Sequence, residues 1–291
     1  MKKLMFAVIA CAMALSGCSS EDNCTTVNPQ PEENATEIKL NAGILGVATR
    51  APVSTNDNIT ASFVASTTDG DYTTNAWNST VTFVASPTPT SALSFSPARY
   101  YPVNSSTIYI KGYYPAGTLA GKSVTLAADG TEDVMITAQA SGTKATASPL
   151  SFIFNPLLTQ LQFKFVSGTG YPASGVNVTS LVIKQQKAPA TLDLNTAAMT
   201  YTTKDLTLSG TFPITTAGAT VSNYPMVKSG EALSVAVTTS DGVTYPETAI
   251  SITTEAGKSH LITLTFTPKE ITAAISVTAW QVGGQGSSSL Q

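Results

Sequence analysis

The chain has 291 residues and few charges, because Lys, Arg, Asp and Glu together make up 11% of the sequence and the formal net charge is −3. Soluble domains usually contain about 25% charged residues. A nucleic-acid-binding surface would need a basic face, which this composition excludes. Disorder is also excluded, since 42% of the residues are apolar and recur at strand spacing. The length allows one large or two ordinary domains.

The first 17 residues have the features of a secretory signal peptide. Lys2 and Lys3 precede an apolar run at residues 4–15, which is too short to span a membrane as a helix. The run ends in Leu15-Ser16-Gly17-Cys18. A cysteine at this position resembles the lipobox of bacterial lipoproteins, in which Cys18 would become the acylated (palmitate-bearing) first residue. The alternative is an ordinary signal peptide with an incidental cysteine.

Cysteine chemistry does not stabilise the exported part of the chain. Cys11 lies in the signal peptide and Cys18 would carry lipid, so Cys24 has no cysteine left with which to form a disulfide or metal cluster. Residues 18–36 are polar and contain several Pro, Glu and Asn residues, a composition typical of flexible linkers. We therefore predict a lipidated tether over residues 18–36, followed by a body that is stabilised by its hydrophobic core.

From residue 37 onward, short apolar alternations separated by Gly, Pro, Asn and Ser predict strands, and no stretch has a sustained helical period. The predicted strands are 37–48, 59–66, 80–85, 107–114, 132–138, 146–155, 158–166, 177–186, 206–214, 221–227, 231–239, 260–267 and 271–282. One-sided alternation is typical of antiparallel sheets packed as sandwiches. So many strands exceed one small sandwich. We predict an all-β fold of two sandwich domains, 37–155 and 156–291, joined at Asn155-Pro156, where proline favours extended backbone.

The sequence gives no indication of catalysis. The one histidine, His260, lies at the start of a predicted strand without a nucleophile, a carboxylate or further metal ligands in its pattern. It is therefore interpreted as a strand-edge residue. Asp69-Gly70-Asp71 lacks the other ligands of a known calcium loop, and most remaining acidic residues suit turns. We predict that the protein is not an enzyme and has no metal site and no cofactor.

Several motifs occur in a recognisable order. After Cys18 comes the strand end Gly112-Tyr113-Tyr114-Pro115, and residues 151–163 then read Ser-Phe-Ile-Phe-Asn-Pro-Leu-Leu-Thr-Gln-Leu-Gln-Phe. The apolar strand 261–266 precedes a final apolar strand at 271–280. In this order the motifs resemble the fimbrillin family of Bacteroidetes, which comprises the subunits of type V pili and their relatives. The resemblance covers nearly the whole chain.

This resemblance implies tandem antiparallel β-sandwiches of transthyretin-like, Greek-key type and a structural role in a cell-surface pilus. It also implies that an arginine-specific protease cuts between Arg50 and Ala51 and so removes a first strand at 37–50. The strand at 271–282 would then act as a donor strand that enters the vacated groove of a neighbouring copy or a related pilin. The donor stripe comprises Ile271, Ala273, Ile275, Val277 and Ala279.

We expect the precursor at the outer-membrane surface, held by its lipid, and the mature subunit in an extracellular fimbrium. A ligand on a host or bacterial surface is compatible with this role. The leading alternative is a monomeric outer-membrane lipoprotein that binds glycans or nutrients. Tyr100-Tyr101 and Tyr113-Tyr114 would provide its aromatic platform, although tyrosines at strand ends more often pack against the fold.

Overall fold

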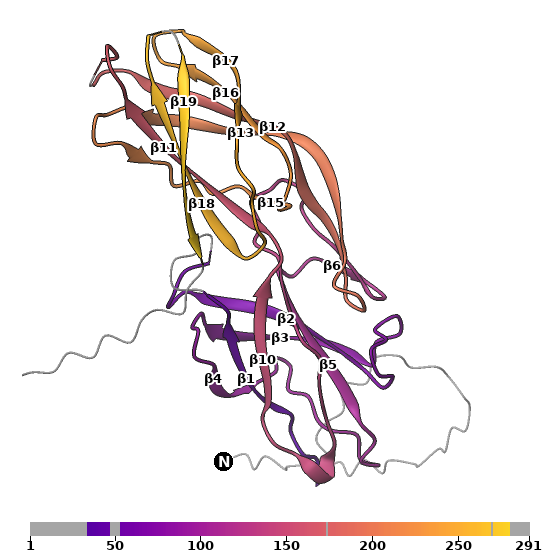
Figure 1. Ribbon diagram of the computed structural model, residues 1–291. Helices are drawn as coiled ribbons and strands as arrows, with labels where there is room; N and C mark the ends of the chain where they lie inside the picture. The colour runs from indigo at the N-terminus through magenta and orange to yellow at the C-terminus, as the bar shows by residue number, and fades with distance from the viewer. Residues whose placement is uncertain (1–33, 47–52, 173, 269, 280–291) are drawn as a thin grey trace, which may run out of the picture. The chain divides into compact units, whose positions relative to one another are not determined.

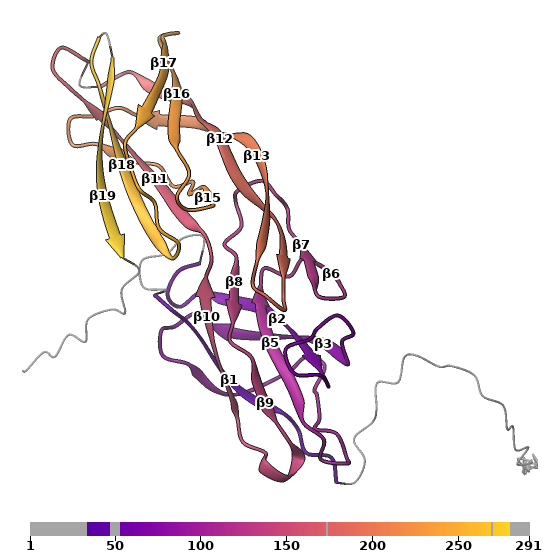
Figure 2. The same cartoon turned by 45° about the vertical axis from the view of Figure 1, so that its right-hand side comes forward.

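The computed structural model describes residues 34–46, 53–172, 174–268 and 270–279, and β-strands make up nearly all of the regular structure there (Figures 1 and 2). The first strands are β1 (Lys39–Ile44), β2 (Asn58–Ser66), β3 (Trp77–Val84), β4 (Thr90–Ser94), β5 (Ile108–Tyr114), β6 (Thr118–Ala120), β7 (Ser123–Thr125), β8 (Met135–Thr137), β9 (Ala140–Gly142) and β10 (Leu150–Pro156). The later strands are β11 (Thr159–Ser167), β12 (Asn177–Asp193), β13 (Met199–Pro213), β14 (Ala219–Thr220), β15 (Met226–Val227), β16 (Leu233–Thr239), β17 (Thr244–Ile250), β18 (Lys258–Phe266) and β19 (Ile271–Ala279). A short 3-10 helix, η2, covers Lys144–Thr146.

The first sheet has eight strands and curves around its own hydrophobic core. Its order is β3-β2-β5-β8-β10-β1-β4, with β9 paired to β5. Phe63 of β2 packs edge-on against Phe152 and Phe154 of β10, with ring centroids 5.1 and 5.8 Å apart, although these strands are not neighbours in the sheet. A bridge between Thr80 and Ser96 connects β3 to the chain after β4. The inward side chains of this sheet therefore form one enclosed cluster.

The other two sheets face each other across a second core. One has the order β14-β11-β18-β19 with β15 paired to β11, and the other has the order β17-β16-β12-β7-β6 with β13 paired to β12 (Figure 1). Alternate residues of β11 and β18 are buried in this core, among them Phe163, Phe165, Ile262 and Leu264. The period-2 alternation in the sequence thus becomes the buried face of a sandwich.

A hairpin from the first half of the chain joins the six-stranded sheet. Strands β6 and β7 pair with each other, and Val124 of β7 lies opposite Leu192 of β12. A third core cluster lies here and includes Val64 and Tyr113 from the first sheet together with Leu194. The division into domains 37–155 and 156–291 remains a prediction. Strands β6 and β7 belong to the first range in sequence, but they pair with β12 of the second range.

The predicted all-β sandwich class is confirmed, with one difference in strand direction. Most neighbours are antiparallel, but β1 runs parallel to β10 and β11 runs parallel to β18. Parallel partners require a long connection, because a tight turn cannot join them. Both pairs join strands far apart in the sequence, and alternation within a single strand does not reveal such pairing.

The β12–β13 hairpin is longer than the predicted strands 177–186 and 206–214. The first of these predicted strands ends at Gln186. Instead, Gln186 is buried, and its side-chain amide donates to the backbone oxygens of Lys184 and Ala232 at 2.9 and 3.0 Å. Burying this amide is tolerated because it is hydrogen-bonded. Past this point β12 continues as far as Asp193.

Candidate assembly strands

Strand β1 lies inside the first sheet, not at its edge. It pairs in parallel with β10, from Leu40 opposite Leu150 to Ile44 opposite Phe154, and antiparallel with β4 on its other side (Figure 1). Loss of an edge strand would leave a single bare sheet edge. In this topology, loss of β1 would instead leave a slot between β10 and β4, with an unpaired backbone edge on each side.

The inward face of β1, extended by Ile38 just before the strand, is completely buried. Ile38, Leu40, Ala42 and Ile44 all have 0% exposure. On the opposite face Gly43 passes close to a loop, where an added Cβ atom would lie 3.1 Å from the Ser86 backbone oxygen. The strand thus fills a closely fitting groove that accepts three large side chains and one small one.

Strand β19 forms one end of the five-stranded sheet. Among the described strands it pairs with β18 alone, with Ile271 opposite Phe266 and Ile275 opposite Ile262. The predicted donor stripe is only partly covered: Ile271 is buried and Ile275 is half-buried, but Ala273 is exposed and Val277 is 51% exposed. Strand β19 therefore presents an apolar stripe and a free backbone edge.

His260 lies within β18 and is fully buried instead of sitting at an exposed strand edge. Its Nε2 accepts a hydrogen bond from the backbone N–H of Glu255 at 3.2 Å, whereas Nδ1 has no partner. Burial lowers the pKa of His260, and the nearby Glu255 carboxylate partly opposes this effect. Among the residues that the structure describes, no three His, Cys, Asp or Glu side chains gather where they could hold a metal ion.

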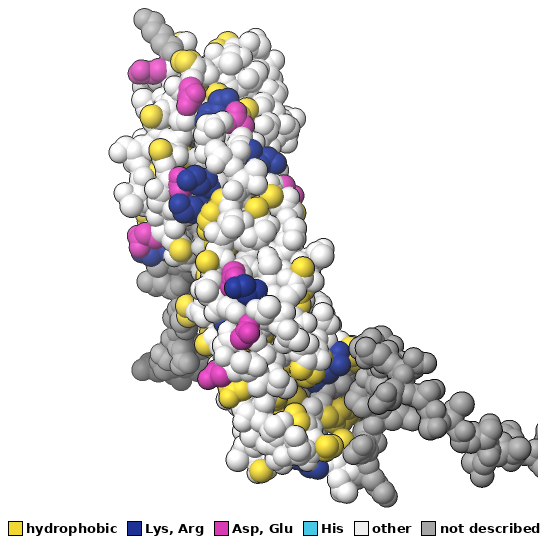
Figure 3. All heavy atoms as spheres, turned by 90° about the vertical axis from the view of Figure 1, so that its right-hand side faces the viewer, with side chains coloured by type: hydrophobic (Ala, Val, Ile, Leu, Met, Phe, Trp, Pro, Cys, Tyr) yellow, Lys and Arg dark blue, Asp and Glu magenta, His cyan; other side chains and the backbone are white. Residues whose placement is uncertain are grey.

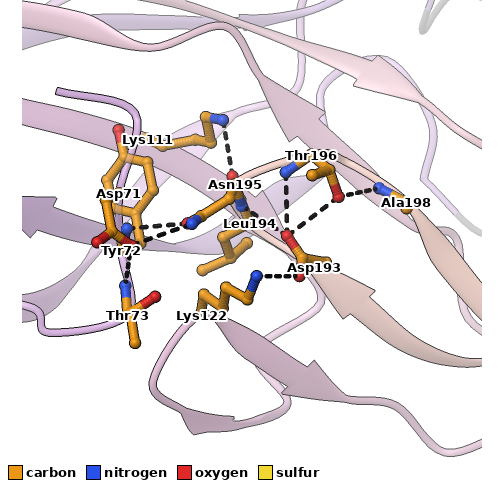
Figure 4. Close-up of polar contacts among 10 residues, drawn as sticks. All are labelled: Asp71, Tyr72, Thr73, Lys111, Lys122, Asp193, Leu194, Asn195, Thr196 and Ala198. Atoms are coloured by element: carbon orange, nitrogen blue, oxygen red, sulfur yellow. Dashed lines mark hydrogen bonds and ion pairs between the residues drawn. The ribbon is translucent and has the colours of Figure 1, made fainter.

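A polar network, which sequence reasoning missed, connects the loop after β2 to the β12–β13 turn (Figure 4). Asn195 is its centre: its Oδ1 accepts from the Tyr72 backbone N–H at 2.9 Å, and its Nδ2 donates to Asp71 at 3.0 Å. Hydrogen bonds from Thr73 and Asn195 lower the pKa of Asp71 to about 2. Lys111 adds a further bond to the backbone oxygen of Leu194 at 2.7 Å. The turn pattern Asp193-Leu-Asn-Thr was the available sequence signal.

The tyrosine pairs do not form an exposed platform. Tyr101 and Tyr113 are each 3% exposed, and their neighbours Tyr100 and Tyr114 are half-buried. Figure 3 shows one face of the molecule, on which the charged side chains form small scattered groups. None of the described helices is long and apolar enough to cross a membrane.

Two predicted sites lie outside the described residues. Cys18 lies before residue 34, and Arg50 with Ala51 lies between residues 46 and 53. The sequence has one other arginine, Arg99, whose Nη2 donates to the Asn78 backbone oxygen at 2.6 Å. Its guanidinium carbon lies 5.3 Å from the Trp77 ring centroid. Arg99 is thus held against the fold.

The fold is all-β, and comparison with known proteins identifies the family to which the chain belongs. The chain belongs to the fimbrillin-like family, whose model matches residues 48–280. Because that family is structural, the protein is a fimbrial or cell-adhesion protein and not an enzyme. A comparison with curated proteins finds no match.

Solved structures from Bacteroides and Parabacteroides species share this fold. A "putative cell adhesion protein" from Bacteroides uniformis has a TM-score of 0.62 at 19% identity, covering 87% of this chain and 100% of its own. One of the same description from Bacteroides ovatus has a TM-score of 0.55 at 15% identity, with 86% and 99% covered. A fimbrial assembly protein from Parabacteroides distasonis has a TM-score of 0.50 at 14% identity, with 84% and 99% covered.

Proposed function

We propose that this protein is a pilus subunit that polymerises by exchanging β1 for the β19 strand of a neighbouring copy or a related pilin. The precursor reaches the outer-membrane surface as a lipoprotein through Cys18, an arginine-specific protease cuts after Arg50, and the mature subunit becomes part of an extracellular fimbrium. The observation that carries the proposal is the position of β1, an internal strand that ends shortly before Arg50.

The energetics support a durable exchange. Burying the large side chains of Ile38, Leu40 and Ile44 stabilises the precursor by about 5–9 kcal/mol in total. That is comparable to the stability of a whole domain. A vacated slot would expose apolar walls and two sheet edges, which favours capture of another strand. The free edge and partly exposed stripe of β19 make it the best-matched occupant among the described strands.

The pattern of side-chain sizes also supports a direction for the incoming strand. Read from its N-terminus, the inward face of β1 is large, large, small, large, with Ala42 as the small residue. The donor stripe from Ile271 to Val277 is large, small, large, large, with Ala273 as the small residue. The two orders match when the donor runs opposite to β1, which makes it antiparallel to β10 and brings Ala273 to the position of Ala42.

Cleavage at Arg50 is the first step to test. We expect treatment of the purified full-length precursor with an arginine-specific protease to convert monomer into polymer, measured by size-exclusion chromatography and electron microscopy. Arg50→Lys should leave the precursor uncut and monomeric. The matched control Arg99→Lys should be cut and assemble normally. A precursor that is cut after Arg50 but remains monomeric would refute the proposal.

Ala273→Leu tests the donor strand and its direction. Ala273 is exposed in the monomer, so the variant should fold with an unchanged melting temperature. In the slot, the larger side chain would overpack the core at a cost of about 1–3 kcal/mol, which reduces assembly roughly 5- to 150-fold. Ala274→Leu, on the opposite exposed face, is the control and should assemble normally. Normal assembly of Ala273→Leu would contradict a donor strand that runs opposite to β1. A donor parallel to β1 would instead place residue 273 at the position of Leu40, where the precursor already holds a leucine.

A further inference from the structure

A pocket of about 420 Å³ lies beside β13, far in sequence from both assembly strands. Strand β13 pairs with β12 alone among the described strands, so its other side is free. Two loops face that free side: residues 129–131, before β8, and residues 222–225, between β14 and β15. The pocket is thus bordered by a strand and two separate loops.

The floor of the pocket is apolar. Leu206 and Leu208 of β13 line it although they are only 6% and 9% exposed, and the buried Pro225 lies on the loop side. An apolar floor with a few polar groups at its margin is the usual composition of a small-molecule site.

The first loop is fixed in place. Asp129 Oδ1 accepts hydrogen bonds from the Thr131 backbone N–H at 2.9 Å and from the Thr131 hydroxyl at 2.7 Å. The Gly130 oxygen accepts from the Met226 backbone N–H at 2.7 Å. Gly130 has a φ of +79°, and a Cβ there would lie 2.8 Å from Leu206 Cδ1, so the position requires glycine. This wall is therefore formed before any ligand arrives.

The second loop bulges away from β11 between two anchored points. The Val221 N–H donates to the Phe163 oxygen at 2.8 Å, and the Leu161 N–H donates to the Pro225 oxygen at 2.9 Å. Residues 222–224 lie between these anchors and place a serine, an asparagine and a tyrosine at the pocket. None of their side chains, nor that of Thr207, makes a hydrogen bond to another described residue. These groups are free to bind a ligand.

We propose that this pocket binds a terminal sugar residue of a neutral glycan. Hydroxyl, amide and carboxylate groups together with a tyrosine suit a ligand with several hydroxyls and an apolar ring face. The Asp129 carboxylate gives the pocket negative charge and disfavours acidic sugars. Lys204 lies near this carboxylate and helps to lower the pKa of Asp129, and its Nζ also donates to the Ala128 backbone oxygen at 3.4 Å. This inference is independent of strand exchange, since it involves neither β1 nor β19.

Titration of the full-length protein with glucose, galactose, mannose and N-acetylglucosamine, followed by ¹⁵N NMR shifts, tests the proposal. At least one sugar should give saturable shifts around residues 222–225 with a dissociation constant on the order of 1 mM, as expected for a ligand of this size. Glucuronate should bind more weakly than its neutral counterpart, glucose.

Two variants distinguish this pocket from binding elsewhere. Asn223→Ala and the nearly isosteric Thr207→Val should each weaken binding about tenfold or more. Asn58→Ala, which changes an exposed asparagine on β2, should have no effect, and all three variants should keep the parent melting temperature. The proposal is overturned if no neutral sugar gives saturable shifts up to about 50 mM, if both pocket variants bind like the parent, or if glucuronate is preferred.

Discussion

His260 shows how one buried polar side chain makes stability depend on pH. Its ring is fully buried with Nδ1 unpartnered, so protonation would place a charge inside the core. The groups that face it electrostatically are the Glu255 carboxylate, which favours the charged ring, and Lys258, which opposes it. The net effect of burial and these charges is a pKa below the usual value of about 6.5.

We expect the free energy of unfolding to fall as the pH drops from about 7.5 to 5.5. The unfolded chain takes up a proton near pH 6.5 that the folded chain resists, so this contribution is complete above that value and is lost as pH falls through the folded pKa. Urea unfolding at several pH values measures the effect. His260→Gln should abolish the dependence, because the sequence has no other histidine. An equal pH dependence in the glutamine variant would contradict this assignment.

Strand β1 has a different importance in the precursor and in the proposed fibre. In the precursor it completes a sheet and fills a core, so its side chains contribute directly to stability. In the fibre it is absent and β19 of a neighbour takes its place. A substitution on β1 should therefore affect one state and not the other.

Leu40→Ala should destabilise the precursor by about 2–5 kcal/mol, because Leu40 is fully buried. Fibres assembled from the same variant should melt like parent fibres, since the altered strand has been removed. Leu45→Ala is the matched control: Leu45 is 49% exposed, and its loss should change stability by less than about 0.5 kcal/mol. A fibre weakened by Leu40→Ala would show that β1 stays in place after assembly.

Strand positions were predictable where alternation is regular, and strand partners were not. The pattern around Leu161, Phe163 and Phe165 predicted β11 closely, because each inward residue is buried in turn. Strand β17 was missed, since Pro246 and Glu247 interrupt its apolar pattern while its partner β16 still pairs with it. The sequence also suggested that 37–48 and 271–282 are similar strands. It did not reveal that the first is internal, because its neighbour β10 is remote in sequence, or that the second is half-exposed.

The network around Asn195 and the sugar pocket were missed for the same reason at the scale of the whole molecule. Asn195 and Tyr72 are 123 residues apart, and neither has a motif that predicts the other. The pocket likewise combines a strand with two loops from separate parts of the chain. Turn chemistry indicated where the chain bends, but tertiary packing decides which bends meet.

The parallel pairing of β11 with β18 has a consequence for when the protein can fold. Gln160 pairs with Ser259, which lies 99 positions later in the sequence, and the first sheet similarly joins β1 to β10 over a long stretch. Such non-local pairing slows folding, because the entropy of closing long loops is lost before the contacts form. The first sheet therefore cannot close until β10 has been made, and the five-stranded sheet cannot close until β18 has been made. Until β18 is available, β11 lacks this partner, and the chain's safety from aggregation in that interval depends on being kept apart from other copies.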